Sequence, residues 1–243
     1  MDSTVAIDAR SLANVRGYYR GGNDPVVWGR YLLGRFGLHR AEIAFAAAHG
    51  IVLYLLVPDA NCSGCVGGDL CGNDRSASQA VRDAQQATAA AQRLGVPAGV
   101  TLFKDIEEVG ACHTELTASY LDAWFGLVQH SHYRAGFYGN ATAQDYDFPR
   151  AYCAAARLDP LFRREVILAQ NEPEPMIGAP RGTIGPSNAP PFTPDRPSCA
   201  PVIVTKIWQY GESLNTDNLT DVDEVQPDTP GLLMPDGSAT SPS

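Results

Sequence analysis

Short apolar, β-branched segments alternate with helical segments along most of this chain. The alternation favours an α/β design built on a parallel sheet. The expected strands are Thr4–Ala9, Val26–Leu32, Ile51–Pro58, Val100–Ile106, Ala135–Gly139, Val166–Gln170, Val202–Tyr210 and Leu219–Val225. The expected helices are Leu38–His49, Ala77–Leu94, Thr114–His130 and Thr142–Arg157.

Eight strands in a chain of 243 residues fit a (β/α)8 barrel of the TIM type, which typically has about 250 residues. Residues 173–201 are rich in Pro, Gly, Ser and Asn, so we expect a missing or shortened helix between strands six and seven. An ordered loop over the barrel mouth and a flexible linker are both compatible with this composition. We expect one barrel domain over residues 1–226 and a flexible tail over residues 227–243.

The composition excludes several classes of partner. The chain has 18 Lys and Arg against 27 Asp and Glu, a formal charge of −9, which argues against binding to a nucleic-acid backbone. No apolar run is long enough to span a membrane. We expect a monomer that needs no cofactor.

Six cysteines fit an oxidised, secreted protein, because an even count allows complete pairing. Cys62-x-x-Cys65 also fits zinc or a redox pair, but no second CxxC or nearby His pair supports a metal site. We expect the Cys62–Cys71 loop to be joined to Cys112, and Cys153 to pair with Cys199. Met1-Asp-Ser-Thr has no features of a signal peptide, so we expect the mature form of a secreted protein.

The strand that begins after Gly99 ends in two carboxylates, Asp105 and Glu107. Side chains two apart on a strand point to one face. Catalytic residues of α/β barrels lie at the strand C-termini, and paired carboxylates there suit glycoside hydrolysis. The alternative is that Asp105 caps a loop and Glu107 is solvated.

Further carboxylates follow other strands. They are Asp8, Glu172, and Asp221 or Asp223. Strands one and eight are neighbours in a closed barrel, so Asp8 and Asp223 could converge. Like charges in one mouth raise the pKa of one member, which keeps a carboxyl protonated as an acid. A structural network is the alternative, with these basic partners: Arg10, Arg30 or Lys104.

Aromatic side chains near strand ends could bind a sugar, since Tyr and Trp offer flat faces and a polar group. The candidates are Tyr31, Tyr54, Tyr138, Trp208 and Tyr210. Asn171-Glu-Pro resembles the acid motif that many barrel glycosidases carry on strand four. Here the tripeptide follows the sixth expected strand, so we expect its resemblance to the strand-four motif to be a coincidence.

In order along the chain, these motifs resemble glycoside hydrolase family 25, the barrel lysozymes, and above all its uncharacterised glycoside-hydrolase-like relatives from actinobacteria and phages. The matching pieces are Ile7-Asp8, Val27-Trp-Gly-Arg-Tyr31, Glu42, Gly50-Ile-Val-Leu-Tyr54, Leu94-Gly-Val-Pro-Ala98, Asp105-Ile-Glu107, Ala135-Gly-Phe-Tyr-Gly139, Ile207-Trp-Gln-Tyr210 and Asp221-Val-Asp223.

The resemblance implies that Glu107 is the general acid and Asp105 stabilises the developing positive charge, with Asp8 and Asp223 shaping the pocket. The implied substrate is the β-1,4 bond after N-acetylmuramic acid in peptidoglycan. The cysteine-rich loop at 61–73 and the insertion at 173–201 depart from the lysozymes. The alternative function is a catalytically weak or inactive barrel that binds wall glycan or another partner.

Overall fold

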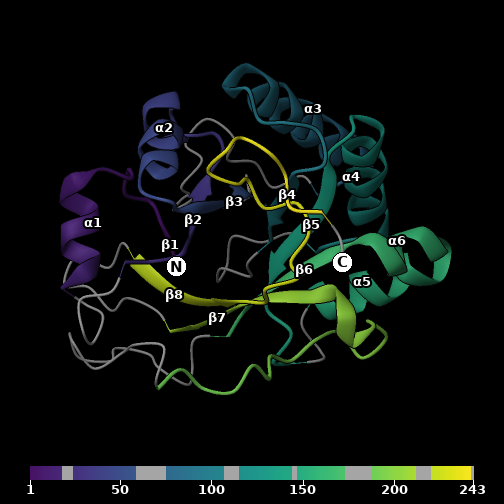
Figure 1. Ribbon diagram of the computed structural model, residues 1–243. Helices are drawn as coiled ribbons and strands as arrows, with labels where there is room; N and C mark the ends of the chain where they lie inside the picture. The colour runs from purple at the N-terminus through teal and green to yellow at the C-terminus, as the bar shows by residue number, and fades with distance from the viewer. Residues whose placement is uncertain are drawn as a thin grey trace.

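Eight strands close into a barrel in the order of the sequence (Figure 1). The computed structural model describes residues 1–17, 24–58, 75–106, 115–143, 147–172, 188–211 and 220–241. The strands are β1 (Asp2–Ser3), β2 (Val27–Tyr31), β3 (Val52–Val57), β4 (Thr101–Asp105), β5 (Arg134–Gly139), β6 (Ile167–Asn171), β7 (Thr205–Gly211) and β8 (Thr220–Val225). The helices are α1 (Ala9–Arg16), α2 (Arg40–Ala48), α3 (Ala77–Leu94), α4 (Ala118–His130), α5 (Asp147–Leu158) and α6 (Pro160–Glu165). This architecture confirms the predicted (β/α)8 class.

The eighth strand differs from a regular α/β barrel in its direction. Strands β1 to β7 are parallel to one another, whereas β8 is antiparallel to both β7 and β1. Thr220 therefore pairs with Ser3, and Val225 pairs with Ile207 near the start of β7. As a result, β8 begins at the rim where the other strands end.

The predicted first strand, Thr4–Ala9, is wrong. The strand is Asp2–Ser3, and Ala9 is the first residue of α1. Asp8 accepts a hydrogen bond from the Ser11 amide at 2.7 Å, and its own amide donates to the Ser11 hydroxyl at 2.9 Å. This reciprocal cap fixes the start of a helix and holds Asp8 at the surface.

The other strands lie within a few residues of their expected positions, and the helix Ala77–Leu94 is confirmed as predicted. The Ser76 hydroxyl caps its start, and Gly95 ends it with a φ of 80°. Helices α1 and α6 were not predicted. Between β6 and β7, the described residues 188–204 contain only the 3-10 turn Val202–Val204, and residues 173–187 of the segment expected to lack a helix lie outside the described residues.

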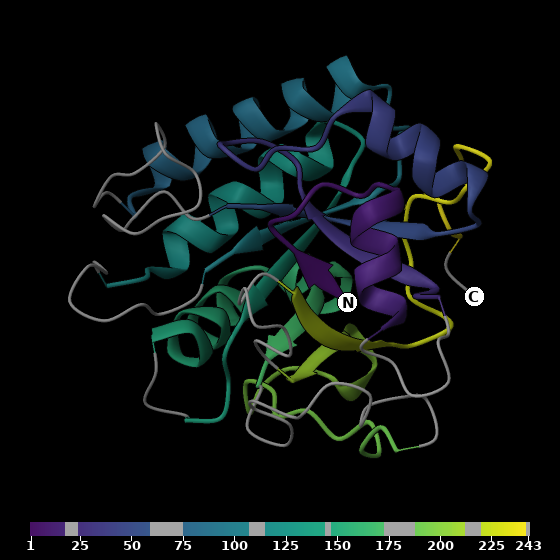
Figure 2. The same ribbon diagram turned by 90° about the vertical axis from the view of Figure 1, so that its left-hand side faces the viewer.

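The segment expected to be a flexible tail instead packs against the bottom of the barrel. Leu233 exchanges two backbone hydrogen bonds with Leu53, at 2.8 and 2.9 Å, and the Thr101 amide donates to the Gly231 carbonyl at 2.7 Å. Leu232 and Leu233 are buried. Figure 1 shows this yellow segment crossing the barrel strands, and Figure 2 shows it from the side. Over residues 227–241, the tail prediction is therefore wrong.

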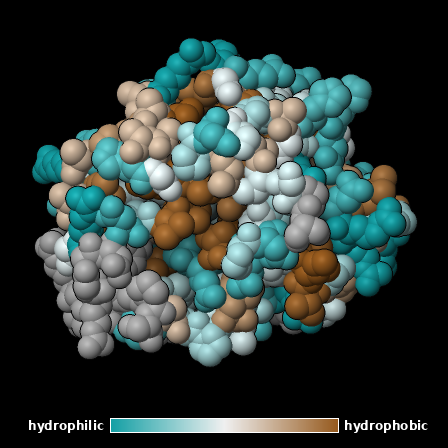
Figure 3. Space-filling view, in the orientation of Figure 1, coloured by the Kyte–Doolittle hydropathy of each residue, from teal (hydrophilic) through white to brown (hydrophobic). Residues whose placement is uncertain are grey.

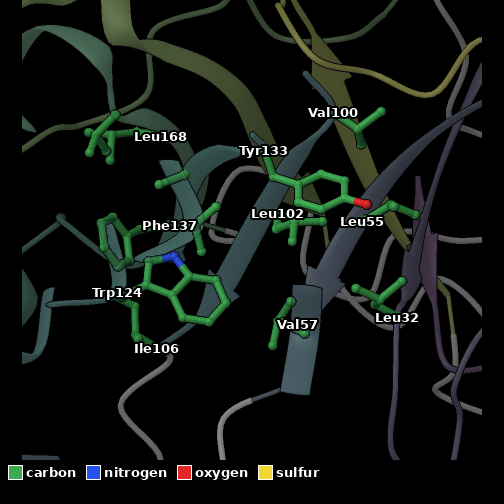
Figure 4. Packing of buried hydrophobic residues seen from close by; sticks show 14 of the residues in the cluster. Leu32, Leu55, Val57, Val100, Leu102, Ile106, Trp124, Tyr133, Phe137 and Leu168 are labelled. Atoms are coloured by element: carbon green, nitrogen blue, oxygen red, sulfur yellow. The ribbon is translucent and has the colours of Figure 1, made fainter. Parts of the chain in front are cut away.

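The outer wall of the barrel packs against the surrounding helices. Trp124 of α4 is fully buried and lies beside Phe137 of β5 and Ile106, which follows β4 (Figure 4). Cys153 of α5 and Cys199 form the expected disulfide, with Cα atoms 5.7 Å apart. The other four cysteines lie outside the described residues. In the described part of the chain, no helix is long and apolar enough to cross a membrane.

Candidate active site at the barrel mouth

Seven strands each contribute a polar side chain to hydrogen bonds across the barrel interior. The alternation of a strand brings these residues to one face while their neighbours pack against the helices. They are Asp2, Tyr31, Tyr54, Asp105, Tyr138, Gln209 and Asp223. Hydrogen bonds across the interior join them into three groups, which together form the candidate site.

The first group joins β2 and β4. The Tyr31 hydroxyl donates to Oδ2 of Asp105 at 3.2 Å. Asp105 is the last residue of β4 and is 7% exposed. The expected nucleophile or stabiliser therefore lies in the interior at the C-terminal end of its strand. The expected acid, Glu107, lies outside the described residues.

The second group contains two carboxylates around one phenol. The Tyr54 hydroxyl is 2.6 Å from Oδ2 of Asp223 and 3.0 Å from Oδ2 of Asp2. The hydroxyl has one proton, so it can donate to one carboxylate and accept from the other only if that carboxyl is protonated. Asp2 is thus a site residue that sequence reasoning missed, in place of Asp8.

Electrostatics favour the protonated form of Asp2. Burial raises the pKa of Asp2 well above its ordinary value, and the neighbouring charges of Asp223 and Asp221 raise it further. The α-amino group of Met1 and the hydrogen bond from Tyr54 act in the opposite direction. Burial, followed by the two carboxylates, also raises the pKa of Tyr54, so this phenol stays neutral.

The third group joins β5 and β7. The Tyr138 hydroxyl donates to Oε1 of Gln209, and both side chains are buried. The aromatic neighbours of Gln209 were predicted as site residues from the sequence, whereas the glutamine itself was not. Strand alternation could have found it, because Gln209 must point the opposite way from Trp208 and Tyr210.

Trp208 lies on the outer side of β7. Its ring contacts Phe192 edge-on, with centroids 6.2 Å apart, and Tyr210 at 5.9 Å. Both β7 aromatics are 4% exposed. Trp208 therefore packs against the segment that precedes β7. Tyr210 lies closer to the second group, because burial and then the charges of Asp223 and Glu224 raise the pKa of its phenol.

A glycine makes room for the phenol that crosses the interior. A Cβ atom on Gly29 would lie 2.2 Å from Cζ of Tyr54 and 2.6 Å from Cβ of Asp2. Both distances are far below van der Waals contact. The second group therefore requires glycine at this position of β2.

Two of the three basic residues suggested as structural partners face the helices, whereas Arg10 is exposed on α1. Arg30 is buried and donates to Oε2 of Glu42 at 2.8 Å. The Lys104 ammonium donates to the Pro58 carbonyl at 2.5 Å and lies 3.8 Å from Asp83 of α3. These contacts connect the barrel wall with α2 and α3, and the interior carboxylates have other partners.

Glu172 directly follows β6, as the strand count predicted. Its Oε2 accepts a hydrogen bond from the Asp195 amide at 2.8 Å, and the residue is 5% exposed. The glutamate of the Asn-Glu-Pro tripeptide thus holds the segment before β7.

These observations define a closed α/β barrel whose interior carries carboxylates, phenols and an amide near the strand C-termini. The model of one protein family, the Rv2525c-like, glycoside hydrolase-like domain, matches residues 14–168. The match covers more than half of the sequence, so the chain belongs to this family. This confirms the glycoside-hydrolase-like part of the resemblance.

One solved structure shows the same fold over nearly its whole length. An uncharacterized B. stearothermophilus protein has a TM-score of 0.75 and 25% identity, over 93% of this chain and 94% of that one. Two weaker matches have TM-scores of 0.42 and 12% identity. They are the catalytic domain of endolysin ply40 from Listeria monocytogenes bacteriophage P40, covering 85% of this chain and 84% of that one, and the autolysin LytC of Streptococcus pneumoniae, covering 92% and 45%. Similarity this low carries no argument about activity. No curated protein matches the chain.

Proposed function

We propose that this protein is a secreted glycoside hydrolase that cleaves the β-1,4 bonds of peptidoglycan. The observation that carries the proposal is the position of Asp105. Its carboxylate lies in the barrel interior at the C-terminal end of β4, bonded to Tyr31, and Glu107 follows two residues later. Barrel enzymes place their catalytic side chains at this end of their strands.

In the proposed reaction, Glu107 protonates the glycosidic oxygen of the leaving sugar. The bond to the anomeric carbon breaks, and Asp105 stabilises the positive charge that develops there. The Tyr31 hydroxyl keeps the Asp105 carboxylate oriented toward this carbon. The configuration is retained if Asp105 or the acetamido group of the substrate traps the cation, and water then completes hydrolysis.

The proposed substrate-binding residues are Tyr31, Tyr54, Tyr138 and Asp223, together with Asp2 and Gln209. Their hydroxyl, carboxyl and amide groups can exchange hydrogen bonds with sugar hydroxyls. Asp8 at the start of α1 and Trp208 on the outside of β7 lie away from this set. The disulfide and the affiliation with glycoside-hydrolase-like proteins support an extracytoplasmic location.

One observation favours a second candidate function, a barrel that binds wall glycan without cleaving it. The interior carboxylates Asp2, Asp105 and Asp223 are all engaged with tyrosine hydroxyls. Such contacts also suit a rigid binding surface.

Two readouts on the same samples separate these functions. Insoluble peptidoglycan is incubated with the wild type and with Glu107→Gln, and then bound protein and released sugar fragments are measured. Glu165→Gln, on the exposed face of α6, is the matched control. If the protein is a hydrolase, the wild type and the control release sugar fragments. Glu107→Gln then binds peptidoglycan but releases no fragments. Binding without release by all three proteins would establish the second function.

A further inference from the structure

The α2–α3 face of the barrel has a charge opposite to that of the whole chain. The protein carries a formal charge of −9. On this face, four arginines are exposed: Arg35, Arg40, Arg82 and Arg93. Within the described residues 24–58 and 75–106, Asp24 is exposed and pairs with Arg16, and the other acidic side chains are buried, with Glu42 bonded to Arg30, Asp83 to Tyr120 and Asp105 to Tyr31. In this described part of the chain, most of the exposed charged side chains are therefore arginines.

A groove runs along the same face. Its walls are the exposed side of α3 and Leu33, which follows β2. The lining residues are Leu33, Arg82, Gln85, Gln86, Ala89 and Arg93. Five of these have helical spacing and form one stripe along α3. In Figure 3, hydrophilic side chains cover the upper edge of the molecule, where Figure 1 places α3.

The two lining arginines, Arg82 and Arg93, lie at opposite ends of the groove. They are eleven residues apart, which corresponds to about 16 Å along a helix. Nε and one terminal nitrogen of Arg82 donate to the Gln79 amide oxygen at 3.1 and 2.6 Å. At the other end, Arg40 of α2 donates to the Arg93 carbonyl at 2.5 Å, which brings a third guanidinium to this end.

We infer that this groove binds a linear anionic glycan chain, a hydroxyl-rich polymer that carries carboxylates or phosphates. Guanidinium groups match both anions in a bidentate geometry. The Gln85 and Gln86 amides between them can exchange hydrogen bonds with hydroxyls. A protein partner would need a larger apolar centre than Leu33 and Ala89 provide. The groove lies outside the barrel and is separate from the interior carboxylates, so it adds a second glycan contact to the proposed active site.

The test measures binding and does not depend on cleavage. The probes are an oligogalacturonide for carboxylates, a poly(glycerol phosphate) oligomer for phosphates, neutral chitohexaose, and poly-glutamate as an acidic peptide. The variant is Arg82→Gln/Arg93→Gln. The control, Arg157→Gln/Arg164→Gln on α5 and α6, removes the same charge from exposed positions elsewhere.

We expect the wild type and the control to bind at least one anionic glycan, with affinity that falls as salt is added. The groove variant should bind it at least about tenfold more weakly, because two charge-assisted contacts are lost. Equal losses in the groove variant and the control would overturn the inference. So would the absence of wild-type binding to either anionic glycan, or binding to poly-glutamate alone.

Discussion

Asp2 and Asp223 approach the same phenolic oxygen, that of Tyr54, from neighbouring strands β1 and β8. The two contacts measure 3.0 and 2.6 Å. Tyr54 comes from β3, so this hydroxyl connects the first and the last strand of the barrel across its interior. Three predictions concern this group and the glycine beside it.

Tyr54→Phe keeps the ring and removes the hydroxyl. Two buried carboxyl groups then lose a hydrogen-bond partner, at a cost of about 1–3 kcal/mol in the free energy of unfolding. Chemical denaturation measures this change. Tyr133→Phe, which removes one hydrogen bond to the Val96 carbonyl, is the control and should cost about 1 kcal/mol. Equal costs for the two variants would show that the carboxylates do not depend on Tyr54.

Asp2→Asn should change the pH dependence of stability. The folded protein raises the pKa of Asp2, so between its unfolded and folded pKa values the native state holds more protons than the unfolded chain. The contribution of Asp2 to stability is then complete below the unfolded pKa and is lost as the pH rises through the folded pKa. Asparagine has no such proton to lose.

The measurement for Asp2→Asn is the free energy of unfolding as a function of pH, from about pH 4 upward. The wild type should lose stability relative to the variant as the pH rises. A constant difference between the two proteins across this range would contradict the assignment of the proton to Asp2.

Gly29→Ala should be strongly destabilising, because the new Cβ would meet the Tyr54 ring at 2.2 Å. Overpacking of this kind costs about 1–3 kcal/mol or more. Gly126→Ala is the control, since that glycine lies exposed within α4 with no heavy atom within 4 Å of the new Cβ. It should stabilise the protein by about 0.5–1 kcal/mol. Thermal unfolding of both variants compares them, and a tolerated Gly29→Ala would contradict the close approach of Tyr54.

The buried ion pair of Arg30 and Glu42 should matter far more than a surface pair. Glu42 also accepts a hydrogen bond from the Ile7 amide at 2.9 Å, so Glu42→Gln leaves a buried guanidinium without its counter-charge. We expect a loss of about 3–5 kcal/mol. Asp24→Asn, which breaks the exposed pair with Arg16, should cost far less, because solvent screens that pair. Similar losses measured by denaturation would contradict this difference.

Local patterns in the sequence predicted most of the fold. Helix α3 has a serine cap, a long run of helix formers and a terminal glycine, so both ends were predictable. The first strand was placed wrongly because Thr4–Ala9 has the composition of a strand. The cap between Asp8 and Ser11, three residues apart, is a helix-start signal that outweighs this composition.

The C-terminal segment shows what local patterns cannot predict. Its Pro, Gly and Ser content is typical of a loop, yet Leu233 pairs with Leu53, which lies 180 residues earlier in the sequence. Similarly, Asp105 was predicted from its position after an apolar strand, whereas Asp2 became evident only from its contact across the closed barrel. Long-range pairing and strand direction determined these outcomes.

The most direct test of the proposed hydrolase is the initial rate of reducing-sugar release from purified peptidoglycan by the wild type and by Glu107→Gln. The two proteins must first show the same thermal unfolding, so that a lost rate reports chemistry. Removal of a general acid should lower the rate by about 10²–10⁴-fold. An equal rate of release from the wild type and Glu107→Gln would contradict the assigned catalytic role.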